Sequence, residues 1–149
     1  MQTLNVRQAT LADLPALAVL FDAYRQFYGR SPDLAGARAF LLERFNHGES
    51  VLFIAHQGEA AVGFTQLYPS FSSVSMARVF VLNDLFVQAQ ARKAGVASSL
   101  LAAAADYAKA FGAVRLTLTT NIDNTVAQSV YAAQGYKRDQ EFFVYHLAL

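Results

Sequence analysis

The feature that most constrains the fold is a strand, a glycine turn and a helix that follow one another between residues 79 and 111. Residues 79–87 are rich in β-branched and aromatic side chains and predict a strand. From about Gly95 to Phe111 apolar residues recur at close to helical spacing. The turn between them reads Arg92-Lys93-Ala94-Gly95-Val96-Ala97. It leaves the first N–H groups of the helix unpaired, where they can bind a phosphate, although the spacing alone also suits a solvated turn.

A second segment, residues 121–136, reads as a polar loop, a short helix, a glycine stop and a new strand. Asn124 or Asp123 can cap this helix, and Gly135 can end it. Together the two segments resemble the GNAT superfamily of N-acetyltransferases. Its acetyl-CoA motif has the form Arg/Gln-x-x-Gly-x-Gly/Ala, and its next motif has the form Asn-x-x-Ala-x-x-x-Tyr-x-x-x-Gly-Phe/Tyr. The second motif is matched in order and spacing by Asn124, Ala127, Tyr131, Gly135 and Tyr136.

The resemblance covers the whole chain and implies a single N-acetyltransferase domain over residues 1–149. The implied fold class is α/β (α+β), with a mixed central sheet of about seven strands flanked by about four helices. Periodicity and turn signals predict helices at 10–28, 33–45, 95–111 and 124–134, and strands at 4–9, 51–55, 61–68, 79–87, 115–119, 136–138 and 142–147. Residues 69–75 are expected to form a loop. In the family, the fourth and fifth of these strands splay apart to admit the pantetheine arm.

Composition excludes several classes of function. The chain has no cysteine, and its three histidines stand apart without metal-ligand spacing, so no metal site is expected. A net charge of +1 gives no case for nucleic acid or an anionic membrane as partner. The N-terminus lacks the pattern of a signal peptide, and no apolar run reaches the roughly 18 residues that span a bilayer. We therefore expect a soluble, cytoplasmic protein.

Acetyl-CoA is the cofactor that the resemblance implies. The main chain of Leu85, Phe86 and Val87 would pair with the pantetheine amides. The amides from Arg92 through Lys93, Ala94, Gly95, Val96, Ala97 and Ser98 would hold the pyrophosphate. Asn124 could contact the cofactor or only cap its helix, and Ala127 would leave room for the cofactor.

Two residues are candidates for proton transfer. Tyr131 occupies the position of the family's general acid, and a neutral phenol can donate to a forming thiolate; the alternative is a tyrosine packed in the core. Asp84 could act as base through water, bind an ammonium group, or form a structural ion pair. The segment 82–87 resembles diamine and spermidine acetyltransferases, in which two consecutive acids are usual, and Asn83 departs from that pattern. An extended strand would place Asn83 and Asp84 on opposite faces.

The resemblance places the acceptor pocket between the first two helices and the centre of the sheet. Tyr24, Tyr28, Asn83 and Asp84 are the expected substrate-binding residues, while Phe21 and Phe27 are better explained by core packing. Tyr68 and Phe71 could close the pocket.

The leading function is an acetyl-CoA-dependent transfer to a primary amine of a small molecule, by direct attack in a ternary complex. Acetylation of a protein N-terminus or lysine, and a non-catalytic acyl-CoA-binding regulatory domain, are the alternatives. Two observations predict a homodimer: segment 142–145 is apolar, and members of the family that the chain resembles often dimerise. The sequence does not identify the acceptor amine.

Overall fold

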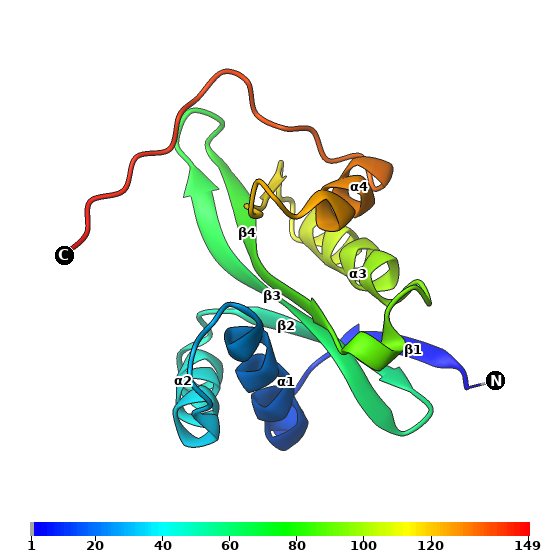
Figure 1. The fold of residues 1–149 in the computed structure, drawn as a ribbon. Coiled ribbons are helices and arrows are strands. Elements are labelled where there is room, and N and C mark those ends of the chain that lie inside the picture. The colour runs from blue at the N-terminus through cyan, green and yellow to red at the C-terminus, as the bar shows by residue number, and fades with distance from the viewer. Residues whose placement is uncertain (1) are drawn as a thin grey trace. The chain divides into compact units, whose positions relative to one another are not determined.

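The structure is a computed structural model that describes residues 2–149. The chain divides into an N-terminal unit that extends to Thr119 and a C-terminal unit from Thr120 to Leu149, and each is described by itself. The N-terminal unit contains a five-stranded sheet in the order β1-β2-β3-β4-β5 (Figure 1). Its strands are β1 (Leu4–Gln8), β2 (Val51–Gln57), β3 (Ala60–Ser72), β4 (Ala77–Val87) and β5 (Leu116–Thr117). The first four pair antiparallel, whereas β5 runs parallel to β4.

Three helices cover the sheet of the N-terminal unit. Helices α1 (Leu14–Phe27) and α2 (Leu34–His47) lie together on one face, and α3 (Val96–Ala110) lies on the other (Figure 1). The apolar stripe of α1 explains its place, because Leu17 and Leu20 are fully buried with Leu41 of α2 and Phe64 of β3. These side chains form the core on the α1–α2 face.

A short network fixes the entry into α1. The backbone N–H of Thr10 donates to the Asp13 carboxylate at 2.8 Å, and Arg7 of β1 donates to the same carboxylate through two nitrogens. This is the backbone-to-side-chain contact of a capping box, with Asp13 in the position that Glu or Gln usually takes. The Arg7 hydrogen bond lowers the pKa of Asp13 to about 2. An ion pair between Arg7 and Asp13 therefore links β1 to the start of α1.

The β3–β4 hairpin is longer than the sequence predicts. Residues 69–72, expected in a loop, continue β3 and pair with residues 77–80 of β4. Cross-strand contacts outweigh the loop composition here, because Arg78 stacks over the ring of Phe71 at 4.2 Å. The turn itself is confined to residues 73–76.

The pairing of β3 with β4 contains one irregularity that matters for function. Gln66 pairs with Asp84, and the next residue of β3, Leu67, pairs with Leu82. Asn83 is therefore an extra residue in β4, a β-bulge. A bulge interrupts the alternation of side chains, so the residues on either side of it no longer follow the simple up-and-down rule.

The C-terminal unit contains helix α4 (Thr125–Ala133). The Asn124 side chain caps it by accepting from the backbone N–H of Ala127 at 3.1 Å, and Gly135 follows it with φ of 93°. The rings of Tyr131 and Tyr136 lie 6.0 Å apart. The predicted helix, its cap at Asn124 and the glycine at its end, Gly135, are therefore all present in this unit.

The two closing strands predicted at 136–138 and 142–147 are absent from residues 2–149, so the sheet has five strands and not about seven. Apolar and aromatic composition gives a segment β propensity, but a strand also needs a partner for its backbone groups, and the sequence pattern does not identify one. The predicted α/β fold class is unaffected by this difference. None of the helices in residues 2–149 is both long enough and apolar enough to cross a bilayer.

Candidate active site

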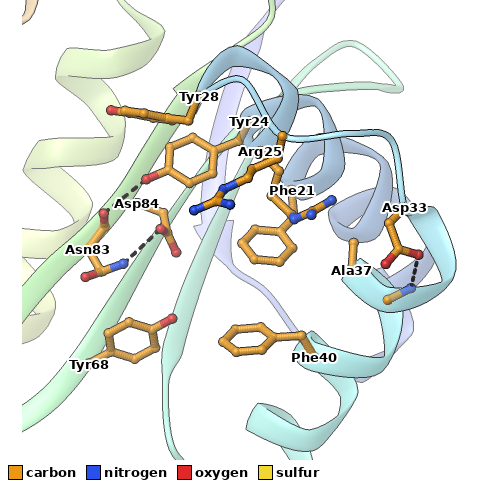
Figure 2. Close-up of a pocket in the computed structure, with 12 residues that line it drawn as sticks. Phe21, Tyr24, Arg25, Tyr28, Asp33, Ala37, Phe40, Tyr68, Asn83 and Asp84 are labelled. Carbon is orange, nitrogen blue, oxygen red and sulfur yellow. Dashed lines mark hydrogen bonds between the residues drawn. The ribbon is translucent and has the colours of Figure 1, made fainter. Parts of the chain in front are cut away.

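A pocket of about 570 Å³ opens between α1, α2 and the centre of the sheet (Figure 2). Aromatic side chains and polar or charged side chains line it in equal numbers. The lining residues are Phe21, Tyr24, Arg25, Tyr28, Arg30, Asp33, Gly36, Ala37, Phe40, Tyr68, Asn83 and Asp84. The four residues predicted to bind the acceptor are among them, and so is Tyr68. Phe27 and Phe71 do not line this pocket.

The bulge in β4 brings Asn83 and Asp84 to the same pocket. The expectation that they face opposite sides of the strand was therefore wrong, because it assumed regular alternation through Asn83. The Asn83 side-chain amide donates to Asp84 Oδ1 at 3.1 Å, as Figure 2 shows. Asn83 is exposed, whereas Asp84 is only 3% exposed. Two neighbouring residues thus offer one exposed amide and one buried carboxyl group.

Asp84 is held by both strands. On β3, the Gln66 side-chain amide donates to Asp84 Oδ2, and the Thr65 hydroxyl donates to the Asp84 backbone carbonyl at 2.7 Å. Burial raises the pKa of Asp84 above the usual range of an aspartate, and hydrogen bonds from Gln66, Asn83 and Tyr24 oppose that rise. A buried carboxyl group with a raised pKa, beside a pocket, is a candidate general base.

Two tyrosine hydroxyls flank this carboxyl group in Figure 2. Tyr24 of α1 donates to the backbone carbonyl of Asn83 at 3.3 Å, which ties the helix to the bulge. Burial, and then the charge of Asp84, raise the pKa of Tyr68 to about 12. Tyr68 is therefore a neutral phenol at neutral pH and can donate a hydrogen bond in the pocket.

One buried acid organises the rim of the pocket. Asp22 of α1 is 6% exposed and accepts from the side chains of Arg25 and Gln26 and from the backbone N–H of Asp33. Arg25 also donates to the carbonyl of Ser31. Because these partners lie on both sides of the loop between α1 and α2, Asp22 fixes the path of that loop over the pocket.

Sequence reasoning missed Gln66 and Asp22 as contributors to the site. Each carried a signal that could have been used: a polar residue at the centre of an apolar segment. Gln66 lies in a buried stretch of β3, and Asp22 interrupts the apolar stripe of α1. Buried polar groups need hydrogen-bond partners, so such interruptions indicate either a structural network or a functional site.

The glycine turn before α3 has the geometry of an anion-binding site. Gly95 is the N-cap of α3 with φ of 79°, and its carbonyl accepts the first helical bond, from Ser99, at 3.0 Å. The N–H groups of the first turn, from Val96 to Ser98, precede that bond and have no partner within the helix. A Cβ atom built on Gly95 would meet nothing within 4 Å, so the backbone is open to a ligand. Lys93 also has a positive φ, of 64°.

Arg92 has a structural role beside this turn. Its Nε donates to the carbonyl of Val87 at 3.0 Å, and its guanidinium lies over the rings of Phe27 and Phe86. The Val87 carbonyl is therefore already bonded, and the Arg92 side chain is folded back on the end of β4. The turn's backbone, more than the Arg92 guanidinium, is the part that is free to meet a phosphate.

Within the described part of the N-terminal unit, residues 2–119, no strand pairs with the edge of β4 beside this turn. Strand β5 pairs with β4 only at Phe80–Leu116 and Val81–Thr117, so the ladder between them ends before Leu85, Phe86 and Val87. Those residues pair on their other side with Thr65, Phe64 and Gly63 of β3. The early end of this ladder agrees with the splayed strands that the family resemblance predicts. The free backbone N–H groups at the start of α3 are donors that suit a pyrophosphate.

The structure thus gathers the predicted residues of the N-terminal unit into three places. Tyr24, Tyr28, Asn83 and Asp84 share one pocket, residues 92–98 form the glycine turn, and residues 85–87 form the open edge. Asn124, Ala127 and Tyr131 lie on or beside α4 in the C-terminal unit. Within residues 2–149 no three His, Cys, Asp or Glu side chains gather in a way that could hold a metal ion.

Comparison with known proteins supports a single family. Residues 17–136 match the family model described as Acetyltransferase (GNAT) family. A Bacillus subtilis (strain 168) protein named uncharacterized N-acetyltransferase YhfO is 50% identical over 144 residues, with 97% of each chain covered. A solved structure described as a probable acetyltransferase has a TM-score of 0.92 and 45% identity, with 97% of each chain covered. The structure of aminoglycoside N-acetyltransferase AAC(6')-Iy in complex with CoA has a TM-score of 0.83 at 22% identity, covering 100% of this chain and 97% of that one, and shares the fold.

Proposed function

Because the chain belongs to the acetyltransferase (GNAT) family and is an acetyltransferase, we propose that it transfers the acetyl group of acetyl-CoA to a primary amine of a small molecule, by direct attack in a ternary complex. The observation that carries this proposal is the buried carboxyl group of Asp84 at an aromatic pocket next to the open edge of β4. The pocket supplies a place for the amine, and the edge and glycine turn supply a place for the cofactor.

Acetyl-CoA fits the residues that would hold it. The amides of Val96, Ala97 and Ser98 at the glycine turn would bind the pyrophosphate, and the β4 edge at residues 85–87 would bind the pantetheine arm. When bound, the cofactor supplies an activated acetyl thioester. Each favourable interaction of a charge with a helix N-terminus contributes about 0.3–1 kcal/mol at an exposed site, so several together give useful affinity.

Asp84 would remove the proton that keeps the acceptor unreactive. An alkyl amine has a pKa near 10.4 and is mostly an ammonium ion at pH 7. In the proposed step an N–H bond of the ammonium breaks and an O–H bond forms on Asp84, directly or through one water. The neutral amine then has its lone pair free for attack. A carboxylate whose pKa is raised by burial is a better proton acceptor than an exposed one.

Tyr131 would be the proton donor for the departing thiolate. A phenol with a pKa of about 10 is neutral at pH 7 and can donate to a forming thiolate, whose acid has a pKa of about 8.5. This role rests on the position of Tyr131 in the motif that begins at Asn124. Asn124 itself caps α4, so any contact with the cofactor would come from the part of its side chain that the cap does not use.

The pocket favours a small acceptor with an apolar part. Five of its twelve lining residues are aromatic, namely Phe21, Tyr24, Tyr28, Phe40 and Tyr68. Its volume of about 570 Å³ is within the range of small-molecule sites. The amine would sit near Asp84, and the apolar part would lie against the rings.

Release of CoA thiol, measured over a panel of primary amines, tests the transfer itself. The proposal expects acetyl-CoA to be consumed only when an amine acceptor is present, with formation of the N-acetyl product. Binding of CoA without turnover on any amine would instead indicate a non-catalytic binding domain.

A matched pair of variants tests the glycine turn. Gly95→Glu places bulk and negative charge where phosphate would bind and should abolish the rise in melting temperature that CoA produces in the wild type. Gly95→Ala is the control, because it adds the same backbone strain at φ of 79° without the charge, and there is space for its methyl group. Equal CoA affinity in the Glu and Ala variants would remove this turn from the cofactor site.

A further inference from the structure

Gln66 is buried in the middle of β3, where its side chain makes one hydrogen bond, to Asp84. It is 0% exposed and lies directly opposite Asp84 in the β3–β4 ladder. Its Nε2 donates to Asp84 Oδ2, while its Oε1 has no protein hydrogen-bond partner within residues 2–149. A buried unpaired oxygen costs about 1–3 kcal/mol, so an apolar side chain of similar size would be easier to bury there. Packing alone does not account for this glutamine.

The two oxygens of Asp84 are held from different sides. Gln66, which does not line the pocket, holds Oδ2 from within the sheet, and Asn83, which does line it, holds Oδ1. Both oxygens of Asp84 thus accept a hydrogen bond from a side-chain amide, one from each strand. A carboxyl group held at both oxygens keeps one orientation beside the pocket.

We propose that Gln66 is a positioning residue, which anchors Asp84 Oδ2 and stabilises the ionised carboxylate inside the sheet so that this carboxylate can accept the proton of the acceptor. This role rests on the proposed function of Asp84 as base. Burial drives the carboxyl group towards its neutral form, which cannot accept a proton, and an N–H donor favours the charged form. Gln66 donates the hydrogen bond that favours the charged form of Asp84, and it does so from the protein interior.

Other groups face Asp84, and the substitutions below leave them in place. From α1 comes Tyr24, from β3 Tyr68, and from β4 Asn83; Arg25, Tyr28, Arg30 and Asp33 line the same pocket. Tyr68, with a pKa of about 12, stays neutral over the range in which an aspartate titrates. A difference in the pKa of Asp84 between the wild type and a Gln66 variant is therefore caused by the change at Gln66.

Two variants remove the donor in different ways. Gln66→Met keeps much of the volume without a hydrogen bond, and Gln66→Glu keeps the shape but replaces the N–H donor by oxygen. Thr65→Val is the matched control, because Thr65 is equally buried and also bonds Asp84, but at the backbone carbonyl. The pKa of Asp84 is read from the ¹³C chemical shift of labelled aspartate carboxyls, with Asp84→Asn for assignment, and compared with the acid limb of kcat/KM.

We expect the Asp84 pKa and the acid limb to move upward together, by about one to two pH units in Gln66→Met and further in Gln66→Glu, where two carboxyl groups share the site. Thr65→Val should leave both in place. An unchanged Asp84 pKa in both Gln66 variants, or an equal shift in Thr65→Val, overturns the proposal. A shifted Asp84 pKa with an unmoved acid limb would support the coupling of Gln66 to Asp84 and overturn the assignment of Asp84 as base.

Discussion

Gly63 on β3 lies so close to the carbonyl oxygen of Phe86 on β4 that a Cβ atom built on it would be 2.8 Å away. The same atom would lie 3.3 Å from Val96 and 3.4 Å from Leu100, both in the first turns of α3. The missing side chain therefore lets the helix that follows the glycine turn approach the open part of β4. Two proposed cofactor contacts, the turn and the strand edge, are brought together at this glycine.

Gly63→Ala should lower stability and weaken CoA binding together. The added methyl group has backbone on one side and a packed helix on the other, and overpacking of this kind typically costs about 1–3 kcal/mol. Denaturant unfolding and CoA titration measure the two effects. A variant of wild-type stability that binds CoA normally would show that the spacing between β3 and α3 is not critical.

Asp84→Asn should lower kcat/KM by about 10²–10⁴-fold on a good amine, because an amide cannot accept the proton. Its effect on stability has a defined sign. Burial raises the pKa of Asp84 in the folded state, so the wild type loses stability as pH rises from the unfolded pKa, about 3.9, through the folded value.

Asn at this position carries no charge at any pH, so the melting temperature of Asp84→Asn relative to wild type should increase over that interval and then level off. Melting curves at several pH values measure this. A relative melting temperature that falls as pH rises would contradict a raised pKa.

Tyr131→Phe should lower turnover by about 10²–10⁴-fold with little loss of CoA affinity, the effect of removing a positioned acid. Tyr136→Phe is the control, since its ring lies 6.0 Å from that of Tyr131 and it loses the same hydroxyl group. Single-turnover rates and CoA titrations separate chemistry from binding. Wild-type turnover in Tyr131→Phe would exclude this residue as the essential proton donor.

Asp22→Asn should raise KM for the acceptor by roughly tenfold or more, with kcat changed much less. The reason is that buried hydrogen bonds that hold the loop over the pocket are lost. A buried group left without its partner costs about 1–3 kcal/mol. Asp33→Asn provides the comparison, since asparagine retains the ability to cap α2 through the N–H of Gly36. Acceptor kinetics for both variants decide the matter. Equal KM values in wild type and Asp22→Asn would show that this loop does not shape the acceptor site.

The elements that local sequence could predict were those with strong local signals. The cap at Asp13, the helix stop at Gly135 and the glycine turn at Gly95 each follow from a residue type that suits its own backbone position. The pocket residues Tyr24 and Tyr28 were predicted through the family resemblance and the polar tips of their rings, and the structure places both there.

The features that local sequence could not predict depend on pairing between distant segments. The bulge at Asn83 arises from the register of β4 against β3, which no single strand reveals. The buried contact between Gln66 and Asp84 has the same origin, because the two residues are 18 positions apart. The homodimer predicted from residues 142–145 stays a prediction, and light scattering at micromolar concentration would test it.

The extra residue at Asn83 also means that two neighbouring positions on β4 can supply the acid of this pocket. Moving the carboxylate by one residue, with Asn83→Asp and Asp84→Asn combined, would place it at an exposed position lining the same pocket. Less desolvation there should give a lower pKa and an acid limb at lower pH. The position that carries the acid would then set the pH range in which the pocket accepts a proton, without any change in the aromatic walls that select the acceptor.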